Sequence, residues 1–360
     1  MKYFYPFIAL LILASCQKDE KKIIDHKDTD WAFYKLNGNV KSISTQSWQV
    51  NEKLEKLKTL HEDHSSRNSD LNFDEDGLLT NEKLYITEAP LETIKYRGRN
   101  KKLEVVQYIN NSPAIKTSYD WDASGENNIA ITRRNADNSQ IDRVEMEYQK
   151  DKLAKKTTLS SQNTLNEKTT YIYDGKGNVI EESFYNSTGE VQYKAVFKYD
   201  KKGNKISDAR YTGDGKKSYE TISNYDGDNL TRKFVNNSNG EIEFSEDFTY
   251  DKKGNMLTHL TYENIDKTKR LEKFGYDDKG NRLEWQVYKN DIPFMAGRFT
   301  YDSHSNQISV IGVDANNKEV DKREYAYTYD AKGNWTKKIV KINGIPQFVA
   351  ERTITYFDKK

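Results

Sequence analysis

Polar and apolar residues alternate with a period of two along most of the chain, in short runs separated by turn-forming residues. In the segment 191–199, VQYKAVFKY, Tyr193 and Phe197 fall on one face, while Gln192 and Lys198 fall on the other. Successive side chains of a β-strand point to opposite faces of a sheet, and the runs are rich in Tyr, Phe, Val, Ile and Thr, which favour strands. The pattern therefore predicts many short β-strands.

The runs belong to an internal repeat. An aromatic residue followed by Asp-x-x-Gly recurs at Phe73, Trp121, Tyr173, Tyr199, Tyr250, Tyr276 and Tyr329, with weaker copies at Tyr96, Tyr148, Tyr225 and Tyr301. Successive copies are 23 to 28 residues apart, and a second Gly- or Asn-rich turn lies about halfway through most periods. A period of this length indicates a repeat architecture, here with two antiparallel strands and two turns in each unit.

The repeated Asp and Gly are predicted to shape the backbone. Asp at the first position and Gly at the fourth indicate a type I turn with a G1 bulge, in which Asp accepts N–H groups of its own turn and Gly takes positive φ. The predicted structural turn residues are Asp174, Gly177, Asp200, Gly203, Asp251, Gly254, Asp277, Gly280, Asp330 and Gly333. Calcium is the alternative, but DEDG at 74–77 lacks the spacing of a calcium loop. The repeated tyrosine is predicted to make cross-strand aromatic pairs on one face of the sheet.

Ten periods predict an all-β fold, a long antiparallel meander of roughly 20 to 22 strands. Because strand twist accumulates over many strands, we expect this sheet to curl into a curved or spiral open shape. One stretch departs from the pattern: in 51–66, Leu54, Leu57 and Leu60 recur every three residues behind a possible Asn51 cap. That spacing predicts either a short inserted helix or an irregular strand.

The N-terminal residues have the pattern of an export signal. A lysine at position 2 precedes an apolar run over 3–13 that is too short for a membrane-spanning helix. The run ends in Leu-Ala-Ser-Cys at 13–16, which resembles a bacterial lipobox, so Cys16 is the predicted lipidation site, carrying acyl groups such as palmitate. The predicted organisation is a lipoprotein signal peptide at 1–15, a flexible polar tether at 16–30 and a repeat domain at 31–360. A plain secretory signal with an incidental cysteine is the alternative.

The residues after Cys16, Gln-Lys-Asp-Glu at 17–20, resemble the lipoprotein export signal of the Bacteroidota. The resemblance implies a lipid-anchored protein of the outer membrane that is exposed at the cell surface. The alternative is a charged tether on a protein that faces the periplasm. Anchoring by more than one acyl chain would hold the protein stably on the membrane.

The amino-acid composition limits the classes of binding partner and of cross-link that can be expected. The formal net charge is +1, with 57 basic and 56 acidic side chains, which argues against a nucleic-acid partner because no strong basic excess exists. Cys16 is the single cysteine, so disulfides and cysteine-ligated metals are not expected. Charged residues make up 31% of the chain and apolar residues 35%, a balance that suits thin sheets with much solvated surface.

No catalytic or cofactor motif stands out. Among the five histidines, His61 and His64 form an H-x-x-H that is weak evidence for a metal without further ligands. The sequence contains no G-x-S-x-G elbow, P-loop or Rossmann fingerprint, and no carboxylate pair is distinguished as an acid–base couple. We therefore expect no enzyme activity, no cofactor and no metal site.

The motif Y-D-x-x-G-N at this spacing resembles the YD repeat, also called the RHS repeat, over about residues 31–360. In large proteins of that family such repeats build a β-sheet shell, sometimes around a toxin, and small lipoproteins of this type are linked to sugar binding. Trp121, Trp285 and Trp335 lie at or near repeat turns, and aromatic faces stack on sugars or anchor protein interfaces. We therefore expect a non-enzymatic surface lipoprotein that binds a glycan or a protein partner. The alternatives are a structural or assembly lipoprotein of the outer membrane, and an RHS-like shell fragment of a toxin system.

Overall fold

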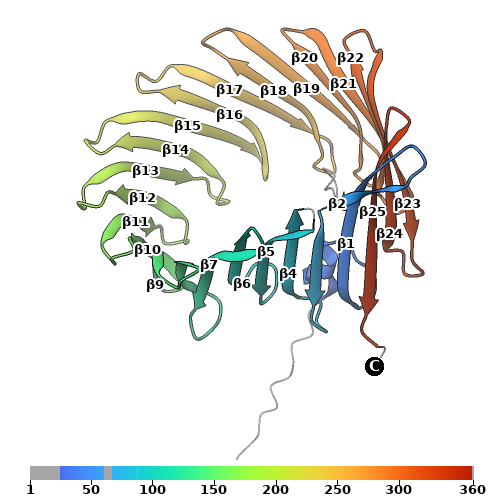
Figure 1. Ribbon diagram of the computed structural model, residues 1–360. Coiled ribbons are helices and arrows are strands. Elements are labelled where there is room, and N and C mark those ends of the chain that lie inside the picture. The colour runs from blue at the N-terminus through green and yellow to red at the C-terminus, as the bar shows by residue number, and fades with distance from the viewer. Residues whose placement is uncertain (1–24, 61–66, 87, 359–360) are drawn as a thin grey trace, which may run out of the picture.

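The computed structural model describes residues 25–60, 67–86 and 88–358. Within these ranges the chain forms 25 antiparallel strands, preceded by two short helical turns, η1 (His26–Asp28) and α1 (Asp30–Phe33) (Figure 1). The first strands are β1 (Val40–Val50), β2 (Lys56–Leu60), β3 (Ser69–Phe73), β4 (Leu79–Ile86), β5 (Ala89–Tyr96), β6 (Lys102–Ile109), β7 (Ser112–Trp121), β8 (Asn128–Asn135), β9 (Gln140–Gln149), β10 (Lys152–Leu159), β11 (Leu165–Tyr173) and β12 (Val179–Tyr185). The remaining strands are β13 (Val191–Tyr199), β14 (Lys205–Thr212), β15 (Lys217–Asp226), β16 (Asn229–Asn237), β17 (Ile242–Tyr250), β18 (Met256–Glu263), β19 (Thr268–Tyr276), β20 (Arg282–Lys289), β21 (Ile292–Tyr301), β22 (Gln307–Asp314), β23 (Glu319–Tyr329), β24 (Trp335–Ile342) and β25 (Ile345–Tyr356).

From β3 to β25 each strand pairs with the next strand along the chain, so the predicted antiparallel meander is confirmed. The exception is at β1. Residues 42–45 of β1 pair with β3, whereas Trp48 and Val50 on the same edge pair with β2. Because β2 and β3 share one edge of β1, the described part of the chain has 24 strand positions around the sheet.

The prediction of an open sheet is wrong, because the sheet closes into a barrel. The free edge of β1 pairs with β25 from Val40 opposite Tyr356 to Gln49 opposite Phe348, with one register shift between Val40 and Ser42 (Figure 1). Twist accumulates along the meander and brings its last strand back to its first. Pairing there satisfies the backbone groups that two exposed edges would leave unpaired.

Of the two structures predicted for 51–66, a short helix or an irregular strand, the helix is not found in the described residues, 51–60. Residues 51–55 form a turn, and the chain then enters strand β2. Asn51 does not cap a helix: its side-chain Oδ1 accepts the backbone N–H groups of Lys53 and Glu55, each at 3.0 Å. Residues 61–66, with His61 and His64, lie outside the described residues.

The repeated turns have the geometry that the sequence predicts. In the turn at Asp200, the N–H of Gly203 donates to the Asp200 carbonyl oxygen at 3.3 Å. The Asp200 Oδ1 atom accepts the N–H groups of Lys202 and Asn204, each at 2.9 Å, and Gly203 has a φ of +95°. Asp174, Asp251, Asp277 and Asp330 accept the equivalent two N–H groups, and Gly177, Gly254, Gly280 and Gly333 also have positive φ.

The repeated tyrosines link neighbouring repeats by hydrogen bonds, a role beyond the predicted aromatic pairing. Four of them donate the phenolic hydroxyl to a backbone carbonyl oxygen twenty residues earlier, at 2.7 to 3.0 Å: Tyr148 to Asn128, Tyr173 to Leu153, Tyr199 to Val179 and Tyr250 to Leu230. Trp121 occupies the tyrosine position in its repeat, and its indole N–H donates to the Lys102 carbonyl oxygen at 2.8 Å. Each of these repeats is therefore hydrogen-bonded to the one before it.

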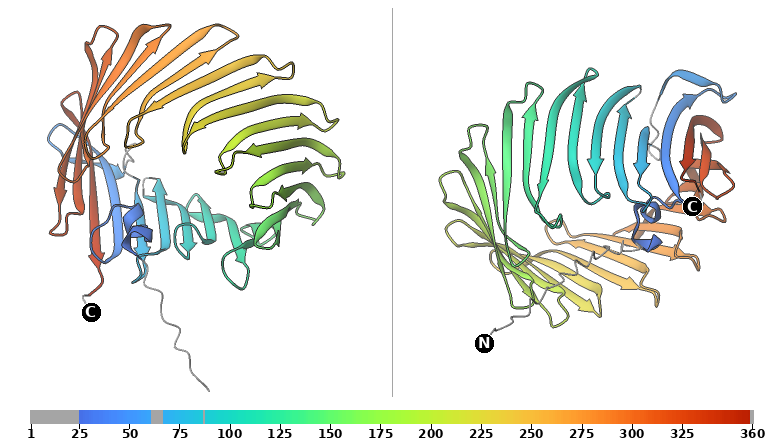
Figure 2. Two further views of the ribbon diagram at one scale, coloured as in Figure 1. Left: turned by 180° about the vertical axis from the view of Figure 1, so that it is seen from behind. Right: turned by 90° about the horizontal axis from the view of Figure 1, so that it is seen from below.

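The main apolar core lies where the barrel closes. Trp31, Leu36 and eight buried residues of β1, β3, β4, β5 and β6 pack into one cluster. The predicted tether at 16–30 is described only from Asp25 onward, and there η1 and α1 lie at the end of the barrel where β1 begins (Figure 2). The Trp31 indole N–H donates to the Val40 carbonyl oxygen at 2.8 Å, and a Cβ at Gly77 would stand only 2.5 Å from the Trp31 ring.

The helical turns are tied to the sheet by Asp30. Its Oδ2 atom accepts the backbone N–H groups of Leu79 at 2.6 Å and Arg99 at 2.9 Å, and Asp30 is almost fully buried. No helix within residues 25–60, 67–86 and 88–358 has the length and apolar character needed to span a membrane.

Candidate ligand-binding surface inside the barrel

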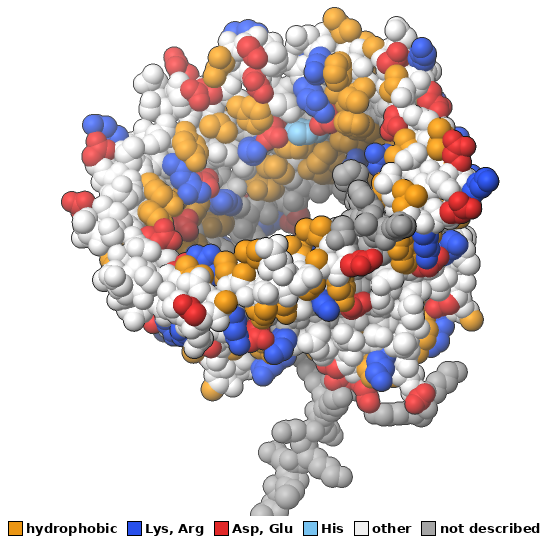
Figure 3. Space-filling view, viewed as in Figure 1, with side chains coloured by type: hydrophobic (Ala, Val, Ile, Leu, Met, Phe, Trp, Pro, Cys, Tyr) orange, Lys and Arg blue, Asp and Glu red, His pale blue; other side chains and the backbone are white. Residues whose placement is uncertain are grey.

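The barrel is hollow, and one face of its strands lines the hollow. Figure 3 shows the opening, with hydrophobic side chains gathered on its wall. The register places large aromatic residues opposite one another on a single face, as in the pairs Phe184–Tyr193 and Phe274–Trp285. We therefore assign this face, which also carries the buried Val287, to the inner wall. It is called the inner face below.

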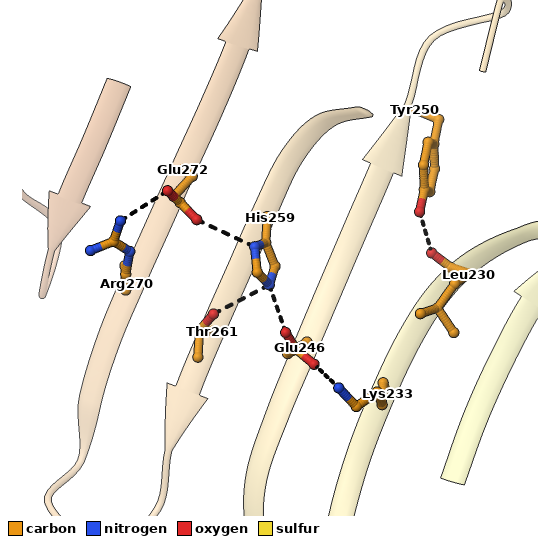
Figure 4. Close-up of polar contacts among 8 residues, drawn as sticks. All are labelled: Leu230, Lys233, Glu246, Tyr250, His259, Thr261, Arg270 and Glu272. Atoms are coloured by element: carbon orange, nitrogen blue, oxygen red, sulfur yellow. Dashed lines mark hydrogen bonds and ion pairs between the residues drawn. The ribbon is translucent and has the colours of Figure 1, made fainter. Parts of the chain in front are cut away.

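A polar network crosses the inner face, centred on His259 of β18 (Figure 4). The His259 Nε2 atom lies 2.9 Å from Glu246 Oε1 on β17, and Nδ1 lies 3.3 Å from Glu272 Oε2 on β19. All three side chains lie on one face because they are cross-strand neighbours: His259 is directly opposite Glu272, and Glu246 is opposite Thr261. The imidazole is thus held between two carboxylates.

Each carboxylate has a second partner further along the wall. Glu246 pairs with Lys233 of β16, and Glu272 accepts Arg270 Nη2 at 2.9 Å and the Trp285 indole N–H at 2.9 Å. These six residues, Lys233, Glu246, His259, Arg270, Glu272 and Trp285, form what is called the His259 network below. It spans five consecutive strands, β16 to β20.

The charges of the network are stabilised locally. Burial disfavours ionisation of Glu246, but hydrogen bonds from Lys233 and His259 outweigh it, so the pKa of Glu246 is lowered below its usual value. The pKa of Glu272 is lowered in the same way, with burial opposed by Arg270 and Trp285. Both carboxylates are therefore ionised at neutral pH and serve as fixed hydrogen-bond acceptors.

Aromatic rings surround these charges. The Phe248 ring stacks on His259, with ring centres 4.7 Å apart and planes 12° apart. Trp285 is half-buried, and its indole N–H bond to Glu272 fixes the orientation of the ring. Flat rings beside oriented donors and acceptors suit a ligand with apolar faces and many hydroxyl groups, as a sugar has.

The network lacks the geometry of a nucleophilic centre. The hydroxyl nearest to the imidazole is that of Thr261, whose Oγ1 lies 3.4 Å from Nε2, while both ring nitrogens already face carboxylates. Among the residues that the structure describes, no group of three or more His, Cys, Asp or Glu side chains is arranged to hold a metal ion. The charged side chains of the His259 network can instead bind polar groups through hydrogen bonds.

The three tryptophans proposed from the sequence are half-buried and lie in different surroundings. Trp285 belongs to the His259 network. Trp335 begins β24, where the Arg352 guanidinium lies 3.6 Å from its ring centre and Tyr327 packs edge-on at 6.2 Å. Trp121 donates its indole N–H to the Lys102 carbonyl oxygen and so links its own repeat to the previous one. Cys16 lies outside the described residues.

Sequence reasoning missed His259 as a site residue. It is one of five histidines, and the carboxylates that flank it lie 13 residues away on either side. The spacing of 13 is half of the 26-residue repeat, so residues at that separation lie on neighbouring strands. Combining the repeat period with the two-residue alternation would have placed these three residues side by side.

Comparisons with known proteins identify no family for this chain. No protein-family model matches the chain, and no curated protein matches it. Among solved structures, the Photorhabdus luminescens Tc holotoxin pore has a TM-score of 0.41 at 12% identity, and a complex of TcdB2-TccC3 with Cdc42 has 0.38 at 12% identity; each covers 79% of this chain and 18% of the other. A porin-like protein from Bacteroides uniformis has a TM-score of 0.23 at 9% identity, covering 89% of this chain and 98% of that one.

The chain thus spans about 18% of the length of the toxin chains that it matches. At these scores the similarities assign neither a family nor a ligand. The resemblance to YD-repeat lipoproteins remains a prediction.

Proposed function

We propose that the protein is a non-enzymatic lipoprotein of the outer membrane, anchored through Cys16, that binds a glycan against the inner face of its barrel. The observation that supports this proposal is the combination of Trp285, oriented by Glu272, with the row of fixed charges in the His259 network. Aromatic platforms beside carboxylates and a guanidinium are suited to sugar rings and their hydroxyl groups.

The size of the barrel is compatible with a polymeric ligand. Twenty-four strand positions spaced ~4.8 Å apart give a circumference of ~115 Å and, for a circular section, a backbone diameter of ~37 Å. Side chains reaching ~5 Å from each wall leave an opening of ~27 Å. A glycan chain fits this space without unfolding of the barrel.

The test is a glycan array probed with purified full-length protein and two variants. Trp285→Ala removes the inner-face ring, whereas Trp48→Ala removes a half-buried tryptophan on the opposite, outer face. We expect the wild type and Trp48→Ala to bind the same glycan and Trp285→Ala to lose at least tenfold in affinity. Absence of glycan binding, together with an outer-membrane protein that co-purifies with the chain, would favour a structural or assembly role.

The proposed lipid anchor and the proposed location at the cell surface are tested separately. Labelled palmitate should be incorporated into the wild type and not into Cys16→Ala. On intact cells, added protease should digest the chain if it faces the medium. Complete protection in intact cells and digestion after outer-membrane permeabilisation would place it on the periplasmic side.

A further inference from the structure

A cavity separate from the His259 network lies where the N-terminal segment meets the last repeats. It has a volume of about 620 Å³. Its walls include residues 34–37, which follow α1, the start of β24 and the end of β25. The Asn334 side chain joins the two walls: its Oδ1 atom accepts the Asn37 N–H at 2.8 Å, and its Nδ2 donates to the Asn37 carbonyl oxygen at 2.8 Å. Asn334 is buried, and its two hydrogen bonds hold Asn37 against the start of β24.

The lining of this cavity is basic. Five of its residues carry or can carry positive charge, namely His26, Lys27, Lys35, His304 and Arg352, and none of the described residues that line it is acidic. Lys27 is paired with Asp25, Nζ to Oδ2 at 3.2 Å. In a chain with a net charge of +1, such a one-sided lining stands out.

Two acidic side chains in turns beside the cavity, Asp302 and Asp330, are already engaged in hydrogen bonds. Asp302 accepts the Tyr329 hydroxyl and the N–H groups of His304 and Asn306. Asp330 accepts the Tyr356 hydroxyl and two N–H groups of its own turn. Hydrogen-bonding atoms of both carboxylates are thus occupied by the turns that they stabilise.

Arg352 is the central cation of the cavity. Its guanidinium lies 3.6 Å from the centre of the Trp335 ring, and its Nε atom is buried without a hydrogen-bond partner. Among the described residues, no carboxylate forms an ion pair with it. Burial lowers the pKa of Arg352 to about 10, so the group is still charged at neutral pH. A desolvated guanidinium without a counter-charge is costly unless an anion approaches it.

We propose that this cavity binds an oxyanion, the carboxylate or sulfate group of an acidic ligand, with Arg352 as the main cation and Trp335 as the platform that orients it. The planar guanidinium donates two parallel hydrogen bonds to such a group, and stacking on an indole fixes the plane of the fork. His304, which stacks on Tyr329 with ring centres 4.1 Å apart, lines the same cavity. This site does not depend on glycan binding at Trp285.

The test is isothermal titration of the purified full-length protein with three probes at constant ionic strength: sodium sulfate, sodium glucuronate and glucose. We expect saturable binding of sulfate and glucuronate and none of glucose. Arg352→Met should weaken both anions at least tenfold. Arg282→Met is the matched control, since Arg282 lies over the Phe274 ring at 4.7 Å outside the cavity, and it should bind as the wild type does.

The two anions also distinguish the source of the oxyanion. Equal affinities would show that the cavity recognises the anionic group alone, whereas tighter binding of glucuronate would show that the sugar ring contributes, and either result supports the site. Binding of neither anion by the wild type, or binding by Arg352→Met within twofold of the wild type, would overturn it.

A second measurement requires no substitution at Arg352. In ¹⁵N-labelled wild type, the Arg352 Nε–H resonance should shift on addition of sulfate while that of Arg282 stays in place. If Arg352→Met does not fold, this resonance decides: an unchanged signal at saturating sulfate would contradict the proposal. Trp285→Ala should leave sulfate binding intact, which separates this site from the proposed glycan surface.

Discussion

The seam of the barrel and its arc are built from the same repeat but are stabilised differently. The seam, comprising α1, β1–β6 and β25, contains ten buried apolar residues in one cluster. In the arc, β10–β21, the buried apolar residues are Ala195, Phe197, Ala209 and Val287, scattered over many strands. The seam thus has a packed core, whereas the arc relies on ladder pairing, turn hydrogen bonds and ion pairs across the sheet.

The comparison separates the parts that hold the barrel closed from those that line its hollow interior. Where α1 fills the inner side of the seam, apolar side chains are covered. In the arc nothing among the described residues covers the inner face, and there the aromatic and charged side chains of the His259 network line the hollow (Figure 3). Stability is therefore expected to be uneven around the ring, as in other repeat architectures.

The largest effect is expected from the core of the seam. Leu79 is fully buried there, so Leu79→Ala should lower the free energy of unfolding by about 2–5 kcal/mol, through lost burial and the cavity left behind. Leu283→Ala in the arc, where the side chain is 37% exposed, should change it by only about 0.5 kcal/mol. Urea unfolding followed by circular dichroism measures both. Equal losses would contradict the difference between the two regions.

The next effect concerns the attachment of α1. Asp30→Ala leaves the buried N–H group of Leu79 and the part-buried N–H group of Arg99 without their acceptor, and we expect a loss of about 1–3 kcal/mol in unfolding free energy. Asp28→Ala, at an exposed position two residues earlier, is the control and should be nearly neutral. If both variants unfold at the urea concentration of the wild type, α1 does not stabilise the seam.

A smaller effect is expected from the hydrogen bonds that fasten one arc repeat to the next. Tyr199→Phe keeps the ring and removes the hydroxyl that donates to the Val179 carbonyl oxygen, at a cost of about 0.5–1.5 kcal/mol. Hydrogen exchange should accelerate in β12 and β13 and remain unchanged in β1 and β25. Acceleration throughout the ring would show that arc and seam open as one unit.

The smallest effect should appear on acidification. The pKa values of Glu246 and Glu272 are lower in the folded protein than their usual value near 4.5. Their contribution to stability is therefore present above about pH 4.5 and is lost as the pH falls through the lower, folded-state values. Glu246→Gln lacks one of these groups, so its unfolding midpoint in urea should fall less than that of the wild type between pH 5 and pH 3. Parallel curves would contradict this.

Local features of the fold could be predicted from the sequence because they depend on neighbouring residues. The turn at Asp200 and Gly203 needs only the side chain of the first residue and the positive φ of the fourth. The strands follow from two-residue alternation, and their antiparallel order follows from the short turns. In the segment 51–66, three leucines at three-residue spacing left a short helix and an irregular strand both open, and of its described residues the last five form strand β2.

Closure could not be predicted, because it joins residues about 300 positions apart. The repeat period gives the number of strands, but the small rotation between strands decides whether the last strand reaches the first. No local sequence motif indicates that Val40 pairs with Tyr356. The Arg352–Trp335 contact was missed for a related reason: Arg352 is on β25 and Trp335 at the start of β24, so their approach depends on register and on a bulge in the sheet.

The most direct test of the account is a cross-link between the first and last strands, in a background where Cys16 is serine. Ser44 on β1 is directly opposite Thr353 on β25, and antiparallel partners lie at Cα distances that a disulfide can span. Ser44→Cys with Asp70→Cys, opposite each other on β1 and β3, is the positive control. A closed barrel predicts that both pairs oxidise to disulfides in the folded protein. Oxidation of the control pair alone, with Ser44→Cys and Thr353→Cys remaining reduced, would show that the sheet is open.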